Sequence, residues 1–168
     1  MPLLSVESLR TYYAVKGGTL KAVDDVSFSL DEGETLALVG ESGCGKSSLG
    51  KTLLRLVDPT AGRIEFDRRN ITHLPQGALR EVRRDIQMVF QDPFASLNPR
   101  QKIGTILSVP LIVHGVKGAR ERGDAVRRIL RQVGLPEEAA ERYPHEFSGG
   151  QRQRIGIARA LILEPKLL

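Results

Sequence analysis

Glycines, a lysine and serines lie close together near residue 45, in a spacing suited to binding phosphate groups. The segment has the form Gly40-x4-Gly45-Lys46-Ser47. Glycines let successive backbone N–H groups point inward at phosphate oxygens, and a helix beginning near Lys46 adds about half a positive charge at its N-terminus. Lys46 supplies a cation for the β- and γ-phosphates, and Ser47 supplies a hydroxyl for Mg²⁺. The pattern predicts a nucleoside triphosphate site formed by Gly40, Glu41, Ser42, Gly43, Cys44, Gly45, Lys46, Ser47 and Ser48.

The flanking residues have the strand–loop–helix order that such a loop requires. Leu36 to Val39 predict a buried strand before the loop, and apolar positions at helical spacing predict a helix that runs from the loop to about Val57. Further strands are expected near both ends of this region, with a short charged helix between the last two. Their ranges are 3–9, 22–30, 62–67 and 86–90 for the strands and 79–84 for the helix.

The second half of the chain has a different character. No strand is predicted from about residue 96 to 146, where helices are expected over 103–113 and 119–133 and a helical turn over 137–142. The second helix is amphipathic, with one apolar stripe formed by Val126, Ile129, Leu130 and Val133. A turn at 147–150 leads into a helix over 151–163, and residues 166–168 resemble the first residues of a strand. We interpret the helical region as a lobe inserted into an α/β core.

The composition is that of an ordinary soluble globular protein. Of 168 residues, 40% are hydrophobic and 27% charged, and no apolar run approaches the length of a membrane span. The N-terminus lacks a signal-peptide pattern, so we expect a cytoplasmic location. A single cysteine, Cys44, excludes an internal disulfide and a cysteine-based metal site. The net charge of +5 does not choose between nucleic acid, nucleotide and membrane partners.

A second motif indicates which family of nucleotide-binding proteins the chain resembles. The residues Phe147-Ser148-Gly149-Gly150-Gln151 open the last predicted helix, where Ser148 and two glycine N–H groups form an anion site. The motif resembles the signature sequence of ATP-binding cassette (ABC) ATPases, usually LSGGQ, with Phe147 in place of leucine. By this resemblance Ser148, Gly149, Gly150 and Gln151 would meet the γ-phosphate held by the P-loop of a second ATPase subunit, in a head-to-tail dimer. A plain helix-capping turn is the alternative.

The resemblance assigns two further residues. Gln91, within Phe90-Gln91-Asp92-Pro93, is similar to the Q-loop glutamine, which reaches Mg²⁺ and the attacking water and is counted with Lys46 as catalytic. Tyr13, or Tyr12 beside it, resembles the aromatic residue that stacks on adenine. The implied cofactors are ATP and Mg²⁺, with Ser47 and Gln91 as metal ligands.

The resemblance also implies a fold and an assembly. The expected fold is α/β: a P-loop NTPase (RecA-like) core, with an N-terminal antiparallel β subdomain and an inserted α-helical subdomain. We expect the β subdomain and P-loop core over 1–95, the helical subdomain over 96–146, and the signature helix with the start of the Walker B strand over 147–168. Transmembrane permease subunits are the implied partners, contacted by the helical lobe and the Q-loop, at the cytoplasmic face of the membrane.

Three longer stretches are similar in sequence to the ATPase subunits of dipeptide and oligopeptide importers. They resemble the second (F-type) of the two paired ATPase subunits. These stretches are Val39–Ser47, Phe90–Arg100 and Arg142–Ser148. The ATPase subunits of nickel and glutathione importers share much of the same sequence in these stretches. The family's Walker B aspartate, catalytic glutamate and switch histidine would follow residue 168, so the C-terminal part of the core is expected to be missing and hydrolysis by this chain to be weak or absent. His73, His114 and His145 do not fit the switch position.

Two other functions fit less of the sequence. A soluble ABC ATPase acting on nucleic acid or ribosomes is suggested only by the basic residues of 117–131 and 152–159, which are interleaved with Glu121 and Asp124. Such helical faces are usually solvated surface, so we expect no nucleic-acid partner. A small-molecule P-loop kinase would leave Ser148 to Gln151 unexplained.

Overall fold

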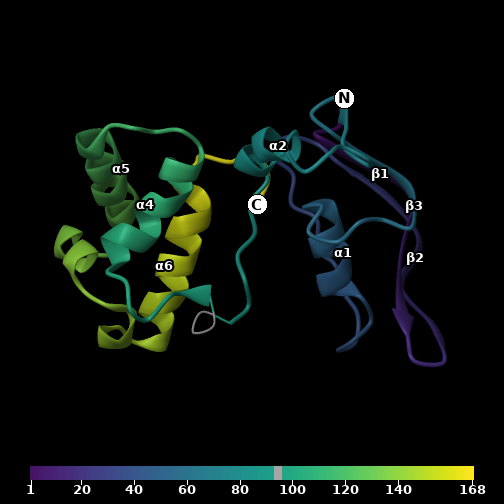
Figure 1. Ribbon diagram of the computed structural model, residues 1–168, viewed down its shortest axis with the longest axis horizontal. Helices are drawn as coiled ribbons and strands as arrows, with labels where there is room; N and C mark the ends of the chain where they lie inside the picture. Colours follow the sequence, from purple (N-terminus) through teal and green to yellow (C-terminus); the bar gives the residue numbers. More distant parts are fainter. Residues whose placement is uncertain (93–95) are drawn as a thin grey trace. The chain divides into compact units, whose positions relative to one another are not determined.

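The computed structural model describes residues 1–92 and 96–168, and its contacts divide the chain into two compact units, Met1–Glu81 and Val82–Leu168 (Figure 1). Pro93, Phe94 and Ala95 of the predicted Q-loop stretch lie outside the described residues, as does the predicted boundary at residue 95. The subdomain boundaries drawn from the sequence stay predictions. The elements of the first unit are β1 (Leu4–Val15), β2 (Gly18–Leu30), α1 (Lys46–Leu53), β3 (Ala61–Phe66), β4 (Arg69–Asn70) and the beginning of α2 (Leu79–Asp85).

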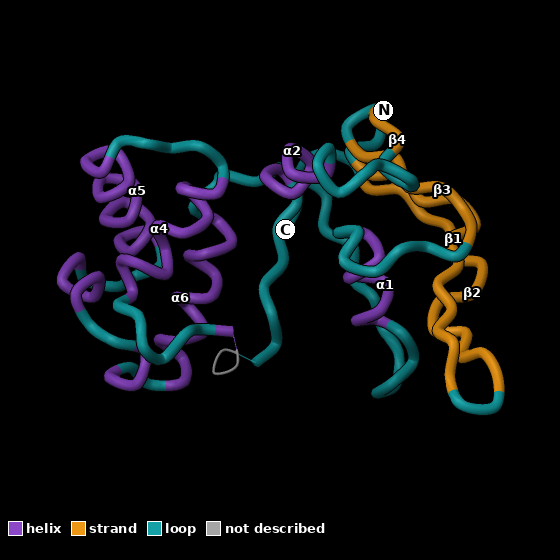
Figure 2. Tube along the Cα trace, in the orientation of Figure 1, coloured by secondary structure: helices purple, strands orange, loops and turns teal. Residues whose placement is uncertain are grey.

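The first unit is built on a four-stranded antiparallel sheet with the strand order β2-β1-β3-β4 (Figure 2). Leu4 lies opposite Leu30 on β2 and opposite Phe66 on β3, which brings three buried apolar side chains together at one end of the central strand. The strands expected at 3–9, 22–30 and 62–67 are confirmed as β1, β2 and β3, although β1 and β2 are both longer than expected; the two-residue β4 was not expected. Helix α1 contacts β1 and β2.

The buried strand predicted at Leu36 to Val39 is not present. These residues form no strand, and Val39 is 94% exposed. A strand requires a neighbour for its N–H and C=O groups, and no described residue pairs with this stretch. Similarly, residues 86–90 do not form the predicted strand. Ile86 makes a single parallel β-bridge with Leu167, and this bridge is all that forms of the strand expected to begin at residues 166–168.

The phosphate-loop helix also ends earlier than predicted. Helix α1 stops at Leu53 instead of near Val57. Arg55 adopts a positive φ of 52°, and the N–H groups of Leu56 and Val57 both turn back to the carbonyl of Lys51. The side chain of Arg55 is buried and donates to the carbonyl of Ile71, so a long-range contact favours this early end.

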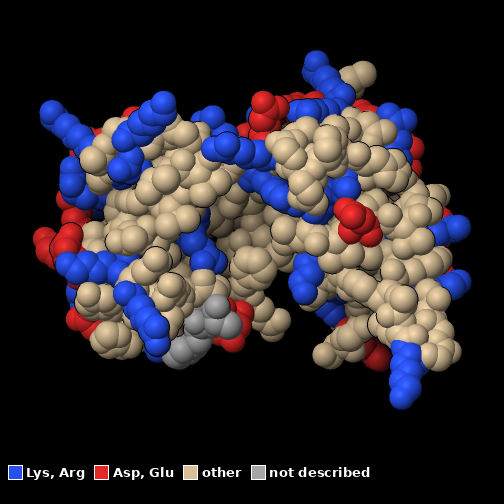
Figure 3. Space-filling view, viewed as in Figure 1, with Lys and Arg blue, Asp and Glu red and all other residues tan. Residues whose placement is uncertain are grey.

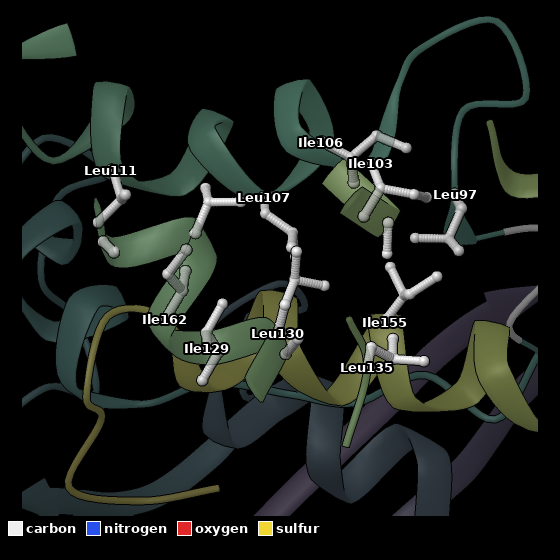
Figure 4. Packing of buried hydrophobic residues seen from close by; sticks show 14 of the residues in the cluster. Leu97, Ile103, Ile106, Leu107, Leu111, Ile129, Leu130, Leu135, Ile155 and Ile162 are labelled. Carbon is white, nitrogen blue, oxygen red and sulfur yellow. The ribbon is translucent and has the colours of Figure 1, made fainter. Parts of the chain in front are cut away.

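The second unit is helical, as predicted. Apart from the end of α2, the elements described in this unit are α4 (Ile103–Val113), α5 (Ala119–Gln132), the 3-10 helices η1 (Glu137–Glu141) and η2 (Pro144–Glu146), and α6 (Gly149–Leu161). Its core is one apolar cluster, in which Leu107 of α4, Leu130 of α5 and Ile155 of α6 are fully buried (Figure 4). The predicted stripe of α5 supplies Val126, Ile129 and Leu130 to this cluster, and Val133 packs at its edge. Among the described helices, none has the length and apolar character needed to cross a bilayer.

Candidate nucleotide-binding site

The phosphate loop has a backbone that only glycine adopts easily. Gly43 and Gly45 have φ angles of 84° and 100°. At Gly45 the constraint is also steric, because a Cβ there would lie 2.0 Å from the carbonyl oxygen of Ala22 on β2. The loop is thus held against the backbone of β2 at the residue where α1 begins.

The N-terminus of α1 presents backbone donors that no side chain caps. Gly45 is the N-cap residue, it has no side chain to accept a hydrogen bond, and the first turn contains no acidic residue. The first N–H groups of a helix lack intrahelical partners, and together with the helix dipole they favour a bound anion. Residues 40–44 and Ser47 are exposed, so the loop is accessible from solvent. The residues present therefore fit a phosphate group.

Lys46 is directed at the loop itself. Its Nζ donates to the carbonyl oxygens of Gly40 and Glu41, each at 2.7 Å, and lies 3.5 Å from Sγ of Cys44. A lysine ammonium has three donors, and a phosphate oxygen would compete with these neutral carbonyls through a stronger charge-assisted bond. The side chain is therefore held within the loop, and its predicted contact with phosphate stays a prediction.

The tyrosines proposed for adenine stacking occupy different surroundings on β1. Tyr13 is half-buried and lies opposite Leu20. The Tyr12 hydroxyl donates to the carboxylate of Asp24, and the ammonium of Lys21 lies 5.3 Å from the centre of its ring. The bond to Asp24 raises the pKa of Tyr12, and the same bond lowers the pKa of Asp24. Sequence reasoning missed this cluster, in which Tyr12 lies on β1 and both charged residues, Lys21 and Asp24, lie on β2. Base stacking by Tyr13 stays a prediction.

Gln91 belongs to the second unit and is exposed, directly after the stretch 86–90. Its predicted contact with Mg²⁺ and water stays a prediction, as does the role of the Ser47 hydroxyl. Within residues 1–92 and 96–168, no group of three or more histidine, cysteine or acidic side chains is placed to hold a metal ion. Mg²⁺ in nucleotide sites is bound largely by phosphates and water, with few protein ligands, so a site of this kind does not require such a group.

The signature residues form the capped start of α6. The backbone N–H of Gln151 donates to Oγ of Ser148 at 3.3 Å, and the backbone N–H of Ser148 donates to Oε1 of Gln151 at 2.9 Å. This reciprocal capping box fixes the turn and leaves Gly149 and Gly150 exposed at the helix end, with open space where a side chain would be. Phe147 is buried in the helical core, which explains why an apolar residue suits this position.

The second unit also contains a groove of about 890 Å³ between the ends of α4, α5 and α6. Its walls combine the apolar Leu111, Ile162 and Leu163 with basic and acidic side chains, namely Arg84, Lys117, Arg120, Arg128, Glu121, Asp124 and Glu164. Several basic residues of this region are paired locally: Arg127 with Asp124, Arg131 with Glu137, and Arg128 with Glu164. Figure 3 shows basic and acidic side chains mixed on the visible surface of this unit instead of one continuous basic face.

A phosphate loop beside an antiparallel sheet, followed by a helical unit with a capped Ser-Gly-Gly-Gln helix, defines an ATP-binding cassette. The family model described as "ABC transporter" matches residues 23–168. The chain belongs to this family. The resemblance inferred from the two motifs and the predicted α/β fold, with its antiparallel β and helical parts, are thereby confirmed.

Relatives and solved structures agree with this assignment. The chain is 52% identical over 174 residues to the oligopeptide transport ATP-binding protein AppF of Bacillus subtilis, covering 99% of this chain and 53% of the relative. It is 51% identical to the glutathione import ATP-binding protein GsiA of Pectobacterium atrosepticum, covering 99% of this chain and 28% of the relative. A solved dimeric ATP-binding cassette, in a post-hydrolysis state bound to ADP and Pi, matches with a TM-score of 0.87 and 31% identity, covering 96% of this chain and 70% of that chain. The chain spans about half the length of the AppF relative.

Proposed function

We propose that this chain is the ATP-binding part of an importer for di- or oligopeptides. The observation that carries the proposal is the phosphate loop, in which two glycines at positive φ, an uncapped helix N-terminus and the inward-pointing Lys46 converge. The peptide-import names of relatives that are 52% identical support the substrate class. ATP would bind with its phosphates on residues 40–48 and with Mg²⁺ on the hydroxyl of Ser47.

The proposed assembly has two kinds of partner. A second ATPase subunit would place its P-loop against the exposed N-terminus of α6, and the dimeric state of the solved cassette supports this arrangement. Transmembrane permease subunits would contact the helical unit. The groove between α4, α5 and α6 supports this contact, because its lining combines apolar and charged side chains that suit a short amphipathic helix. The chain would then act at the cytoplasmic face of the membrane, as a peripheral subunit.

The test is equilibrium binding of Mg-ATP to the chain and to two lysine variants of the same helix. Lys46→Ala removes the ammonium directed at the loop, whereas Lys51→Ala removes an exposed ammonium in the last turn of α1. We expect Lys46→Ala to weaken binding by roughly 10-fold or more, since charge-assisted bonds to phosphate contribute about 1.5–3 kcal/mol. Lys51→Ala should bind like the parent. Equal binding by both variants would contradict the proposed site.

A further inference from the structure

Strand β1 and helix α1 are joined by a buried pair of hydroxyl groups. Oγ1 of Thr11 on β1 lies 3.0 Å from Oγ1 of Thr52 on α1, and both residues are 0% exposed. Neither residue belongs to a nucleotide-binding motif. The pair nevertheless connects the two elements that carry the proposed site, because α1 follows the phosphate loop and Thr11 directly precedes the two tyrosines.

The direction of the hydrogen bond between the two threonines follows from counting protons. A threonine hydroxyl has one proton to donate. Oγ1 of Thr52 donates its proton to the carbonyl of Ser48, at 2.8 Å. Thr11 must therefore be the donor in the pair, and the hydrogen bonds run from Thr11 through Thr52 to Ser48 in the first turn of α1. Loss of the Thr52 hydroxyl would leave the buried Thr11 donor without an acceptor, which is costly. Loss of the Thr11 hydroxyl leaves the bond from Thr52 to Ser48 in place, so the two threonines are not equivalent.

The strand is irregular at this point, which makes its position dependent on such contacts. The pairing of β1 with β2 shifts register on both sides of Thr11, between Leu9 and Thr11 and between Thr11 and Tyr12. The N–H of Tyr12 leaves the ladder and donates to Oγ1 of Thr60, at 2.9 Å, and the N–H of Thr60 donates to the carbonyl of Arg10 at 2.7 Å. Residues 10–12 are thus held by α1 and the segment after it, in addition to the sheet.

We propose that Thr11 is a positioning residue, which sets the tyrosine-bearing end of β1 at a defined distance from the phosphate loop. The inference rests on the proposed function and on the predicted stacking of the base on Tyr13, which together put the base of ATP on β1 and its phosphates on the loop. Its consequence is specific. Loss of the Thr11 hydroxyl should weaken the binding of the base without weakening the binding of the phosphate chain.

The experiment compares two probes, Mg-ATP and inorganic tripolyphosphate, on Thr11→Val and Thr11→Ser. Thr11→Val keeps the side-chain shape and leaves the Thr52 bond to Ser48 in place. We expect it to raise the Kd for ATP about 3- to 10-fold, the effect of one lost hydrogen bond, with the tripolyphosphate Kd unchanged. Thr11→Ser keeps the donor and should restore the parent ratio of the two affinities. If Thr11→Val folds poorly, the double variant Thr11→Val/Thr52→Val removes donor and acceptor together and should show the same change in ratio.

The outcomes separate this inference from the proposed function. If the parent chain and Lys46→Ala bind ATP equally well, the proposed function is refuted. Parent binding that depends on Lys46, together with an unchanged ratio in folded Thr11→Val, would overturn the positioning role alone. An equal loss for ATP and tripolyphosphate would also overturn it, because it would place the effect in the phosphate loop.

Discussion

Replacing Gly45 by alanine should damage the protein much more than replacing Gly43, although both glycines belong to the phosphate loop. Both have positive φ, and for an L-residue this conformation costs roughly 1–2 kcal/mol. Only at Gly45 would the new Cβ meet another atom, the carbonyl oxygen of Ala22 at 2.0 Å, while nothing lies within 4 Å at Gly43. Backbone atoms cannot rotate away, so β2 must move, at a cost of about 1–3 kcal/mol more.

The expected free-energy losses are therefore about 2–5 kcal/mol for Gly45→Ala and about 1–2 kcal/mol for Gly43→Ala. Against a typical total stability of about 5–15 kcal/mol, the first variant should lose a large share of its stability. Urea unfolding followed by far-ultraviolet circular dichroism measures both values, with Gly43→Ala as the matched control for backbone strain. If the two variants unfold at the same urea concentration, the close approach of the loop to β2 is not a constraint in solution, and the reasoning fails.

Two further predictions concern contacts outside the loop. Tyr12→Phe removes the hydrogen bond that lowers the pKa of Asp24, so NMR titration should find this pKa raised toward its ordinary value of 3.8. The lowered pKa of Asp24 contributes stability above pH about 4, and this stability is lost as the pH falls through the folded-state pKa. The free energy of unfolding of Tyr12→Phe should therefore depend less on pH in the acid range. An unchanged pH profile would argue against the hydrogen bond. Arg159, whose pKa is lowered by burial, donates to the carbonyl of Ser96. Arg159→Met should destabilise the helical unit by about 1–3 kcal/mol in urea unfolding. Arg154→Met should destabilise it less, because the exposed Arg154 makes only a long bond of 3.4 Å to the carbonyl of Gly134.

The sequence alone predicted those features whose physical causes are local. Helix α4 was expected over 103–113 and forms there, and α5 differs from its prediction by one residue at its end. Helices close their hydrogen bonds within four residues, and an amphipathic stripe marks the side that packs. The capped turn at Ser148 is local in the same way, since the residue that completes it, Gln151, is three positions away. The positive-φ glycines of the phosphate loop follow equally from residue type and spacing.

Other features were decided only by residues far apart in the chain. The apolar stretch Leu36 to Val39 has the composition of a buried strand, but strand formation depends on a partner, and no described residue provides one. The early end of α1 depends on the burial of Arg55 against Ile71. The Thr11–Thr52 pair joins residues 41 positions apart. The sequence determined the chemistry of the phosphate loop and of the signature turn, because both depend on neighbouring residues, whereas the placement of β1 against α1 is a tertiary contact that no local pattern encodes.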